Sequence, residues 1–177
     1  MDKILEERFH AIRNDLQFIG MDNPGQRYST SPIGSFGYRN CNGVVLLGLA
    51  GDGLERTAPS NGVVLTHYGR TQGTKKEYDR PLTEEEIFRY MNRAIASLRR
   101  AGVEEIVAAV VGGDKAHFDT IVDFLSRHNI DANYLHCDGS PDEITANHRR
   151  PNKHIMVSPL TEEAILCIDD ADYIRLL

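Results

Sequence analysis

Apolar residues recur at helical spacing in three parts of the chain. Near the N-terminus, apolar side chains three or four positions apart predict an amphipathic helix that ends around Gly20; they are Leu5, Phe9, Ile12, Leu16 and Ile19. A longer stripe follows Thr83 and Glu86, which have the spacing of a capping box, and predicts a helix to about Arg100. A third stripe predicts a helix over residues 116–128.

Compact apolar runs between turn residues predict the strands. Apolar runs rich in Val, Leu or Ile have the length of strands; they cover residues 41–49, 62–67 and 104–111. Residues 131–136 predict a further short strand. Lys153–Ser158 and residues 164–168 are separated by a short turn and predict a terminal hairpin. The stretch 21–33 contains Asp-Asn-Pro-Gly and Ser-Pro, so we expect irregular chain there. Residues 50–61 and 71–81 are expected to form polar loops.

The order of these elements bears on fold class and domain organisation. Strands outnumber helices and the two are mixed along the chain, which favours a layered α/β or α+β sandwich. No repeat and no linker rich in Pro, Gly or Ser divides the 177 residues, a length typical of one domain. We therefore expect residues 1–20 to pack as a helix on a single domain that spans residues 21–177.

The composition limits the partners and the compartment. Lys and Arg number 20 against 26 Asp and Glu, and the net charge of −6 argues against binding to nucleic acid or to anionic membranes. The longest apolar runs are far shorter than a membrane-spanning helix, and the mixed charges near the N-terminus do not resemble a secretory signal. Three cysteines without close spacing argue against a disulfide framework, so we expect a cytoplasmic protein.

Cys41 and His67 are the most informative positions. Cys41 begins one predicted strand and His67 ends another. If these strands are antiparallel neighbours, both side chains lie at one edge of the sheet. A neutral imidazole can there take the thiol proton and hold the cysteine as a thiolate in an ion pair. From the pattern alone, a cysteine beside an apolar strand is more often a small core residue.

A group of potential metal ligands lies in the C-terminal part of the chain. It consists of His136, Cys137, Asp138, His148 and His154. The spacing of these residues matches no zinc motif, so we expect no metal site. No glycine-rich loop has the spacing of a nucleotide-binding motif either, and we expect no cofactor.

Residues 35–47, Ser-Phe-Gly-Tyr-Arg-Asn-Cys-Asn-Gly-Val-Val-Leu-Leu, resemble the active-site strand of the CheD chemoreceptor glutamine deamidases. In that family a hydroxyl residue, here Ser35, stands six positions before the nucleophilic cysteine, with a glycine between them. Gly62-Val-Val-Leu-Thr-His67 resembles the family's second strand, which ends in the catalytic histidine. The resemblance covers roughly residues 30–168, and more distantly the same fold is shared with the deamidase domain of cytotoxic necrotizing factor toxins.

The resemblance implies an α+β protein, a layered α/β/β sandwich with mixed, largely antiparallel sheets. It implies that Cys41 attacks the side-chain amide of a protein glutamine and forms a thioester, while His67 transfers protons and Ser35 orients the imidazole. Backbone N–H groups around Asn40 and Asn42 would stabilise the oxyanion. The implied partners are a protein substrate that carries a reactive glutamine and a regulatory protein; no cofactor, nucleic acid or membrane insertion is implied.

Two other functions stay open at this point. The same pair of Cys41 and His67 can hydrolyse another amide, a thioester or an ester, and only the deamidase releases ammonia from a glutamine. Alternatively, the chain is a non-catalytic adaptor on the same fold. Arg39-Asn40 precede the cysteine where the family commonly has Gly-Ser, and this departure keeps the adaptor open as an alternative.

Overall fold

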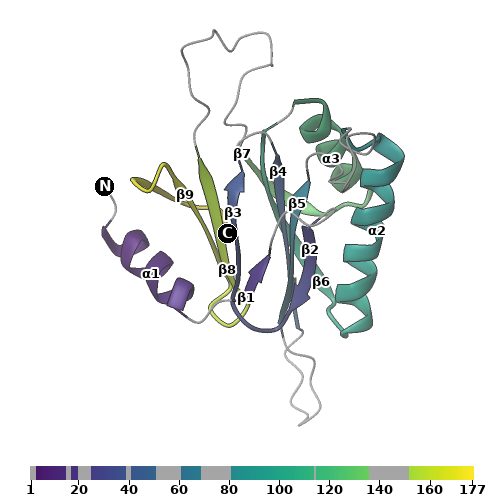
Figure 1. Ribbon diagram of the computed structural model, residues 1–177. Coiled ribbons are helices and arrows are strands. Elements are labelled where there is room, and N and C mark those ends of the chain that lie inside the picture. The colour runs from purple at the N-terminus through teal and green to yellow at the C-terminus, as the bar shows by residue number, and fades with distance from the viewer. Residues whose placement is uncertain are drawn as a thin grey trace, which may run out of the picture.

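The computed structural model describes residues 3–14, 17–19, 25–38, 41–50, 61–68, 81–113, 115–135 and 152–177. The described helices are α1 (Lys3–Asn14), α2 (Glu84–Arg100) and α3 (Lys115–Arg127). The described strands are β1 (Gln17–Ile19), β2 (Gly25–Ser29), β3 (Ile33–Tyr38), β4 (Asn42–Leu49), β5 (Gly62–Tyr68), β6 (Glu105–Val111), β7 (Asp131–Leu135), β8 (Lys153–Ser158), β9 (Glu163–Ile168) and β10 (Asp172–Arg175). Figure 1 shows the strands gathered between α1 on one side and α2 with α3 on the other.

The strands form two sheets of five. In the first sheet the order is β1-β3-β8-β9-β10, and in the second sheet it is β2-β5-β4-β6-β7. Neighbouring strands are antiparallel except β1 with β3 and β6 with β7, which are parallel. The prediction of an α+β sandwich with mixed, largely antiparallel sheets is therefore confirmed.

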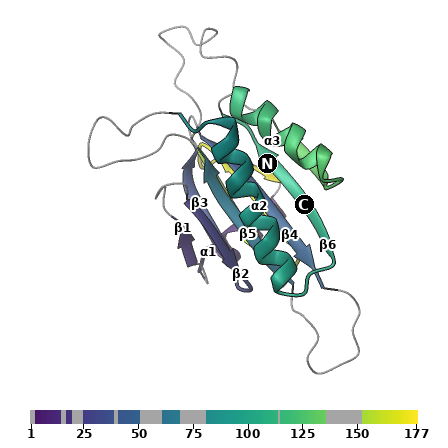
Figure 2. The same ribbon diagram turned by 90° about the vertical axis from the view of Figure 1, so that its right-hand side faces the viewer.

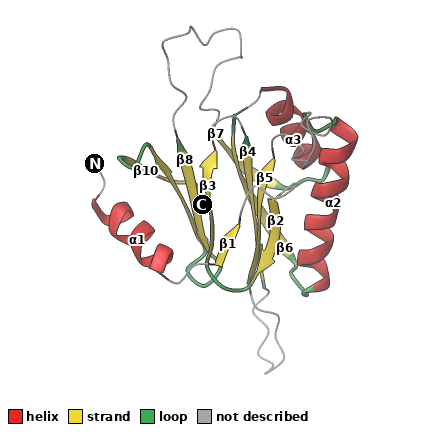
Figure 3. Cartoon of the chain, viewed as in Figure 1, coloured by secondary structure: helices red, strands yellow, loops and turns green. Residues whose placement is uncertain are grey.

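The two sheets stack face to face, and helices cover both outer faces. Helix α1 lies on the first sheet, where Phe9 and Ile12 pack against Met156 and its neighbours. Helices α2 and α3 lie on the second sheet, as the turned view in Figure 2 and the cartoon in Figure 3 show. The layers are thus helix, sheet, sheet and helices, so α1 adds a layer to the predicted α/β/β arrangement.

Strand β4 shows how the sequence produces this layering. Successive side chains of a strand point to opposite faces. Val45 and Leu47 contribute to the core between the two sheets, whereas Val44 and Leu46 contribute to the core under the helices. Because both faces of the second sheet are covered, the strand is apolar on both faces, which explains its uninterrupted run of buried residues.

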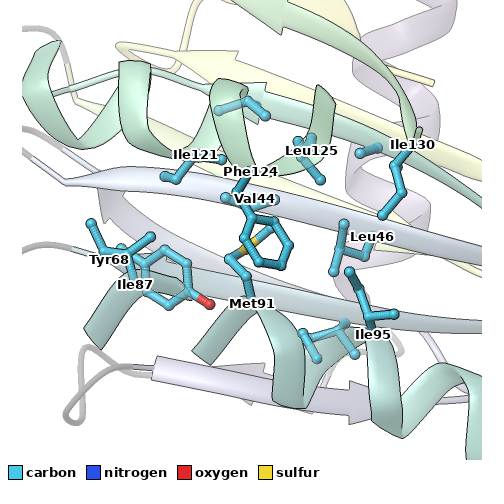
Figure 4. Close-up of a cluster of buried hydrophobic side chains, with 14 of the residues drawn as sticks. Val44, Leu46, Tyr68, Ile87, Met91, Ile95, Ile121, Phe124, Leu125 and Ile130 are labelled. Atoms are coloured by element: carbon cyan, nitrogen blue, oxygen red, sulfur yellow. The ribbon is translucent and has the colours of Figure 1, made fainter. Parts of the chain in front are cut away.

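Helix α2 forms as its sequence predicts. The Thr83 side chain accepts a hydrogen bond from the Glu86 backbone N–H, and the Glu86 carboxylate accepts one from the Thr83 backbone N–H. The buried stripe of α2 meets side chains of α3 and of β4 (Figure 4). This stripe consists of Ile87, Met91, Ala94, Ile95 and Leu98.

The N-terminal segment differs from its prediction. Helix α1 ends at Asn14, and Gln17–Ile19 form strand β1 instead of continuing the helix to Gly20. Ile19 lies opposite Ser35 in the parallel pairing with β3. The apolar spacing of the segment is compatible with a helix, but pairing with a strand distant in sequence determines the observed conformation.

Besides β1 and β3, two short strands were absent from the predicted elements. Strand β2, Gly25–Ser29, occupies the stretch expected to be irregular, and it pairs as an edge strand with β5. Strand β10, Asp172–Arg175, follows a tight turn in which Asp169 and Asp170 have positive φ angles. Both strands are short and polar, so they lack an apolar signal. None of the described helices is long and apolar enough to cross a membrane.

Candidate active site

Cys41 and His67 lie at the same end of two neighbouring strands in the second sheet. Strands β4 and β5 are antiparallel neighbours, as the sequence predicts, with Gly43 opposite His67 and Asn42 opposite Tyr68. Cys41 directly precedes β4, is partly buried and packs against the core between the sheets. His67 is only 3% exposed. On β5, His67 points to the same face as Val63 and Leu65, which belong to the core between the sheets. The side chains of Cys41 and His67 therefore both face the first sheet.

Ser35 reaches His67 from the opposite sheet. Residues 35–47, which resemble one active-site strand, are divided between β3 in the first sheet and β4 in the second. The Ser35 hydroxyl oxygen lies 3.0 Å from His67 Nδ1, and both side chains are buried. The structure therefore brings together Ser35 and His67, which are 32 residues apart in the sequence.

A β-bulge at Gly37 places a fourth residue, Tyr38, at the same site. The register of β3 against β8 shifts between Phe36 and Tyr38, and Gly37 has a φ of 80°, which glycine adopts without strain. In a regular strand, Ser35 and Tyr38 would point to opposite faces. The extra residue turns Tyr38 inward as well, where it is fully buried between the sheets.

Tyr38 holds the imidazole in place. Its ring stacks on the His67 ring, with centroids 3.9 Å apart and planes 15° apart. Its hydroxyl donates a hydrogen bond of 2.8 Å to the Thr66 carbonyl and also forms a hydrogen bond with Ser35. Gly43 leaves the space for this ring, because a Cβ there would lie 3.0 Å from Tyr38 Cε1. A buried tyrosine needs a partner for its hydroxyl, which Thr66 and Ser35 supply here. The sequence analysis missed Tyr38, because no sequence signal marks it.

The hydrogen bonds around Tyr38 determine which imidazole nitrogen carries the proton. The phenol has one proton, and it goes to the Thr66 carbonyl, so the phenol oxygen must accept from Ser35. Ser35 has then used its own proton and must accept from Nδ1–H of His67. The lone pair is consequently on Nε2, which has no hydrogen-bond partner among the described residues. Nε2 is the nitrogen that can act as a base.

Burial keeps both Cys41 and His67 neutral, contrary to the expected ion pair. Burial lowers the pKa of His67 to about 4. Burial also raises the pKa of the Cys41 thiol, although the charge of Lys153 acts in the opposite direction. The neutral thiol and the neutral imidazole are thus the major forms near pH 7, and the thiolate–imidazolium pair is a minor form. The physical reason is that a low-dielectric site penalises both charges. Both residues lie at the same end of their strands, but the structure shows no hydrogen bond between Cys41 and His67 Nε2.

The expectation that backbone N–H groups around Asn40 and Asn42 stabilise the oxyanion stays a prediction, because the position of the Asn42 side chain does not test it. Asn40 lies outside the described residues, as does Arg39. Asn42 is fully buried, and it points to the same face of β4 as Val44 and Leu46, which face the helices. Its side chain therefore lies on the face of the sheet opposite Cys41.

The predicted absence of a metal site concerns residues that are mostly not described. His136, Cys137, Asp138 and His148 lie outside the described residues. His154 lies in β8 on the α1 side, where its ring contacts Phe36 and its Nδ1 accepts from the Gly37 backbone. Within the described parts of the chain, no three His, Cys, Asp or Glu side chains are grouped as metal ligands.

No known protein-family model matches this sequence, and no curated protein is significantly similar to it. A reaction can therefore be assigned to the site only from its own geometry and from the resemblance of residues 35–47 and 62–67 to the deamidase motifs.

Proposed function

We propose that this protein is a cysteine-dependent glutamine deamidase, in which Cys41 is the nucleophile, His67 the general base and acid, and Ser35 the residue that orients His67. One observation carries the proposal. The buried contact of 3.0 Å between Ser35 and His67 Nδ1 leaves Nε2 unprotonated at the strand edge where Cys41 lies. The resemblance to the CheD deamidases supports glutamine as the substrate group.

The first half of the reaction forms a thioester. Nε2 takes the proton of the Cys41 thiol as the sulfur bonds to the carbonyl carbon of a glutamine side chain. The tetrahedral intermediate carries its negative charge on the former carbonyl oxygen. The imidazolium then gives its proton to the amide nitrogen, the carbon–nitrogen bond breaks, and ammonia leaves. During this step the Nδ1–H bond to Ser35 stabilises the positive charge of the ring.

The second half of the reaction returns the enzyme to its starting state. His67 Nε2 takes a proton from water as the water oxygen attacks the thioester carbonyl. The carbon–sulfur bond breaks, the sulfur of Cys41 regains a proton from the imidazolium, and the glutamate product is released. The net reaction consumes one water and releases one ammonia for each glutamine. A cytoplasmic location accords with this proposal, because a reducing compartment keeps the nucleophile as a free thiol.

The proposal is tested by measuring ammonia release from glutamine-containing peptides, with asparagine-containing peptides of the same sequence as a comparison. We expect ammonia from the glutamine peptides and the mass increase that accompanies conversion of an amide to an acid. Cys41→Ala should abolish both signals. Cys167→Ala is the matched control, because Cys167 is 1% exposed and packs under α1, remote from His67.

Three results would contradict the deamidase. Ammonia release by Cys41→Ala equal to that of the unaltered protein would exclude Cys41 as the nucleophile. Hydrolysis of small esters or thioesters without ammonia release would favour the alternative hydrolase. A Cys41 thiol whose reactivity does not depend on His67 would favour the adaptor.

A further inference from the structure

Lys153 is an unusual residue for the position that it occupies. Lysine is rarely fully buried, yet Lys153 is 0% exposed at the start of β8. On β8, Lys153 points to the same face as Ile155 and Val157, which belong to the core between the sheets. Its side chain therefore faces the second sheet. Its Nζ donates a hydrogen bond of 2.7 Å to the Gly112 carbonyl. A buried ammonium is costly, and the mechanism derived above does not use it.

The partner of Lys153 shows where its charge lies. Gly112 directly follows β6, whose last residue, Val111, lies opposite Gly43 on β4. The Gly112 carbonyl is therefore at the end of β6 that adjoins the Cys41 end of β4. On the other sheet, Lys153 lies opposite Tyr38, the residue whose ring stacks on His67. The ammonium thus lies between the sheets at the edge that carries Cys41.

We propose that Lys153 is the electrostatic partner of Cys41 and that its fixed positive charge stabilises the thiolate during the reaction. The hydrogen bond to Gly112 holds the ammonium in place, and no proton passes to or from Lys153. A charge that is shielded from water interacts strongly with another charge nearby. The inference rests on the proposed role of Cys41 as a nucleophile, and it names the residue whose charge stabilises the Cys41 thiolate.

The surroundings of Cys41 support this role for Lys153. Besides Lys153 on β8, the titratable side chains that the described structure places around Cys41 are Tyr38 on β3 and His67 on β5. Burial raises the pKa of Tyr38 and lowers the pKa of His67, so neither residue carries a resting charge at neutral pH. Residues 106–113, which include the end of β6, have no titratable side chain. Among the described residues around Cys41, Lys153 is the remaining cation, and its charge lowers the pKa of the Cys41 thiol against the effect of burial.

The test is the rate at which iodoacetamide labels Cys41 across pH, measured by mass spectrometry of the Cys41 peptide. Lys153→Met removes the charge at similar length, and Lys153→Gln removes it but keeps a donor for the Gly112 carbonyl. We expect both variants to label Cys41 about tenfold more slowly near pH 7 and to shift the alkaline limb of the profile upward by about one pH unit. Lys153→Arg keeps the charge and should stay closer to the unaltered protein. Lys115→Met is the control, because Lys115 is exposed and pairs with Asp119 on α3.

A purely structural role of Lys153 would lower thermal stability without moving this pH profile. An unchanged profile in a folded Lys153→Gln protein would therefore overturn the inference. If neither neutral variant folds, lysine side-chain NMR of the unaltered protein decides. The Lys153 resonance must then shift with the pH midpoint of Cys41 labelling, and the shift must disappear in Cys41→Ser. Its persistence in Cys41→Ser would also overturn the inference.

The labelling experiment needs no substrate, so it is independent of the deamidase proposal. A Lys153-dependent profile without ammonia release would leave the electrostatic pair intact and contradict the deamidase. Ammonia release with a pH profile that does not depend on Lys153 would leave the deamidase intact and contradict the electrostatic pair.

Discussion

The substitution Tyr38→Phe tests the hydrogen-bond chain that prepares His67. It removes the phenol oxygen but keeps the ring that stacks on the imidazole at 3.9 Å. Ser35 loses the acceptor for its proton and can then donate to His67 Nδ1 instead. In that arrangement the imidazole proton moves to Nε2, and the base is lost. We expect a folded protein whose Cys41 reacts more slowly near pH 7.

The magnitude follows from the bonds that the phenol makes. The hydroxyl donates a bond of 2.8 Å to the Thr66 carbonyl at a site that water does not reach. Loss of one partner from a buried hydrogen bond costs about 1–3 kcal/mol in the free energy of unfolding. If the tautomer change costs the same amount, the rate of Cys41 labelling falls roughly 5- to 150-fold.

Tyr68→Phe is the matched control for this prediction. Tyr68 is also fully buried, directly follows His67 on β5, and donates a hydrogen bond of 3.0 Å to Gln26. It faces the helices, so its loss should cost a similar free energy of unfolding without a change in the imidazole. Urea unfolding measures the stability of both variants, and nitrogen NMR of His67 identifies the protonated ring nitrogen. The reasoning is refuted if Tyr38→Phe keeps the proton on Nδ1, or if both variants slow Cys41 labelling equally.

Three further predictions concern the same site. Ser35→Ala leaves Nδ1–H without its acceptor, and we expect a loss of about 1–3 kcal/mol of stability together with slower Cys41 labelling, both restored by Ser35→Thr; equal labelling by all three proteins would contradict this. Because the pKa of His67 is lowered from 6.5 to about 4, the unfolded chain binds the proton first as the pH falls. Stability should therefore be lost between about pH 6.5 and 4, by roughly 3 kcal/mol, and His67→Asn should show a shallower dependence in urea unfolding across that range. Gly43→Ala places a Cβ 2.5 Å from Ile155 Cδ1 and 3.0 Å from Tyr38 Cε1, so we expect a destabilisation of about 1–3 kcal/mol and a disturbed Tyr38–His67 stack; unchanged stability would show that the sheets can separate there.

Much of the fold could be predicted from local sequence. Helix α2 follows from its stripe and its capping box, and the β8–β9 hairpin follows from two apolar runs around a short turn. The strands β1, β2, β3 and β10 could not be predicted from the pattern, because each is short and gains its stability from pairing with partner strands. Such pairing leaves little apolar signal in the sequence.

The candidate site divides in the same way. The edge shared by Cys41 and His67 follows from the order of two apolar runs, whereas Ser35 was identified only through the family resemblance. Tyr38 could not be predicted, because its inward position depends on the register shift at Gly37. Lys153 could not be predicted either, because a lysine at the start of a strand normally indicates an exposed end.

The most direct test of the account is the pH profile of Cys41 labelling by iodoacetamide in the unaltered protein and in His67→Ala. The minor thiolate–imidazolium form has a constant population between the two pKa values of the pair. We therefore expect a plateau of labelling from about pH 4, followed by an alkaline limb above the ordinary pKa range of a thiol. His67→Ala should lose the plateau and keep only the alkaline limb. Identical profiles in the two proteins would show that His67 does not activate Cys41 and would contradict the account.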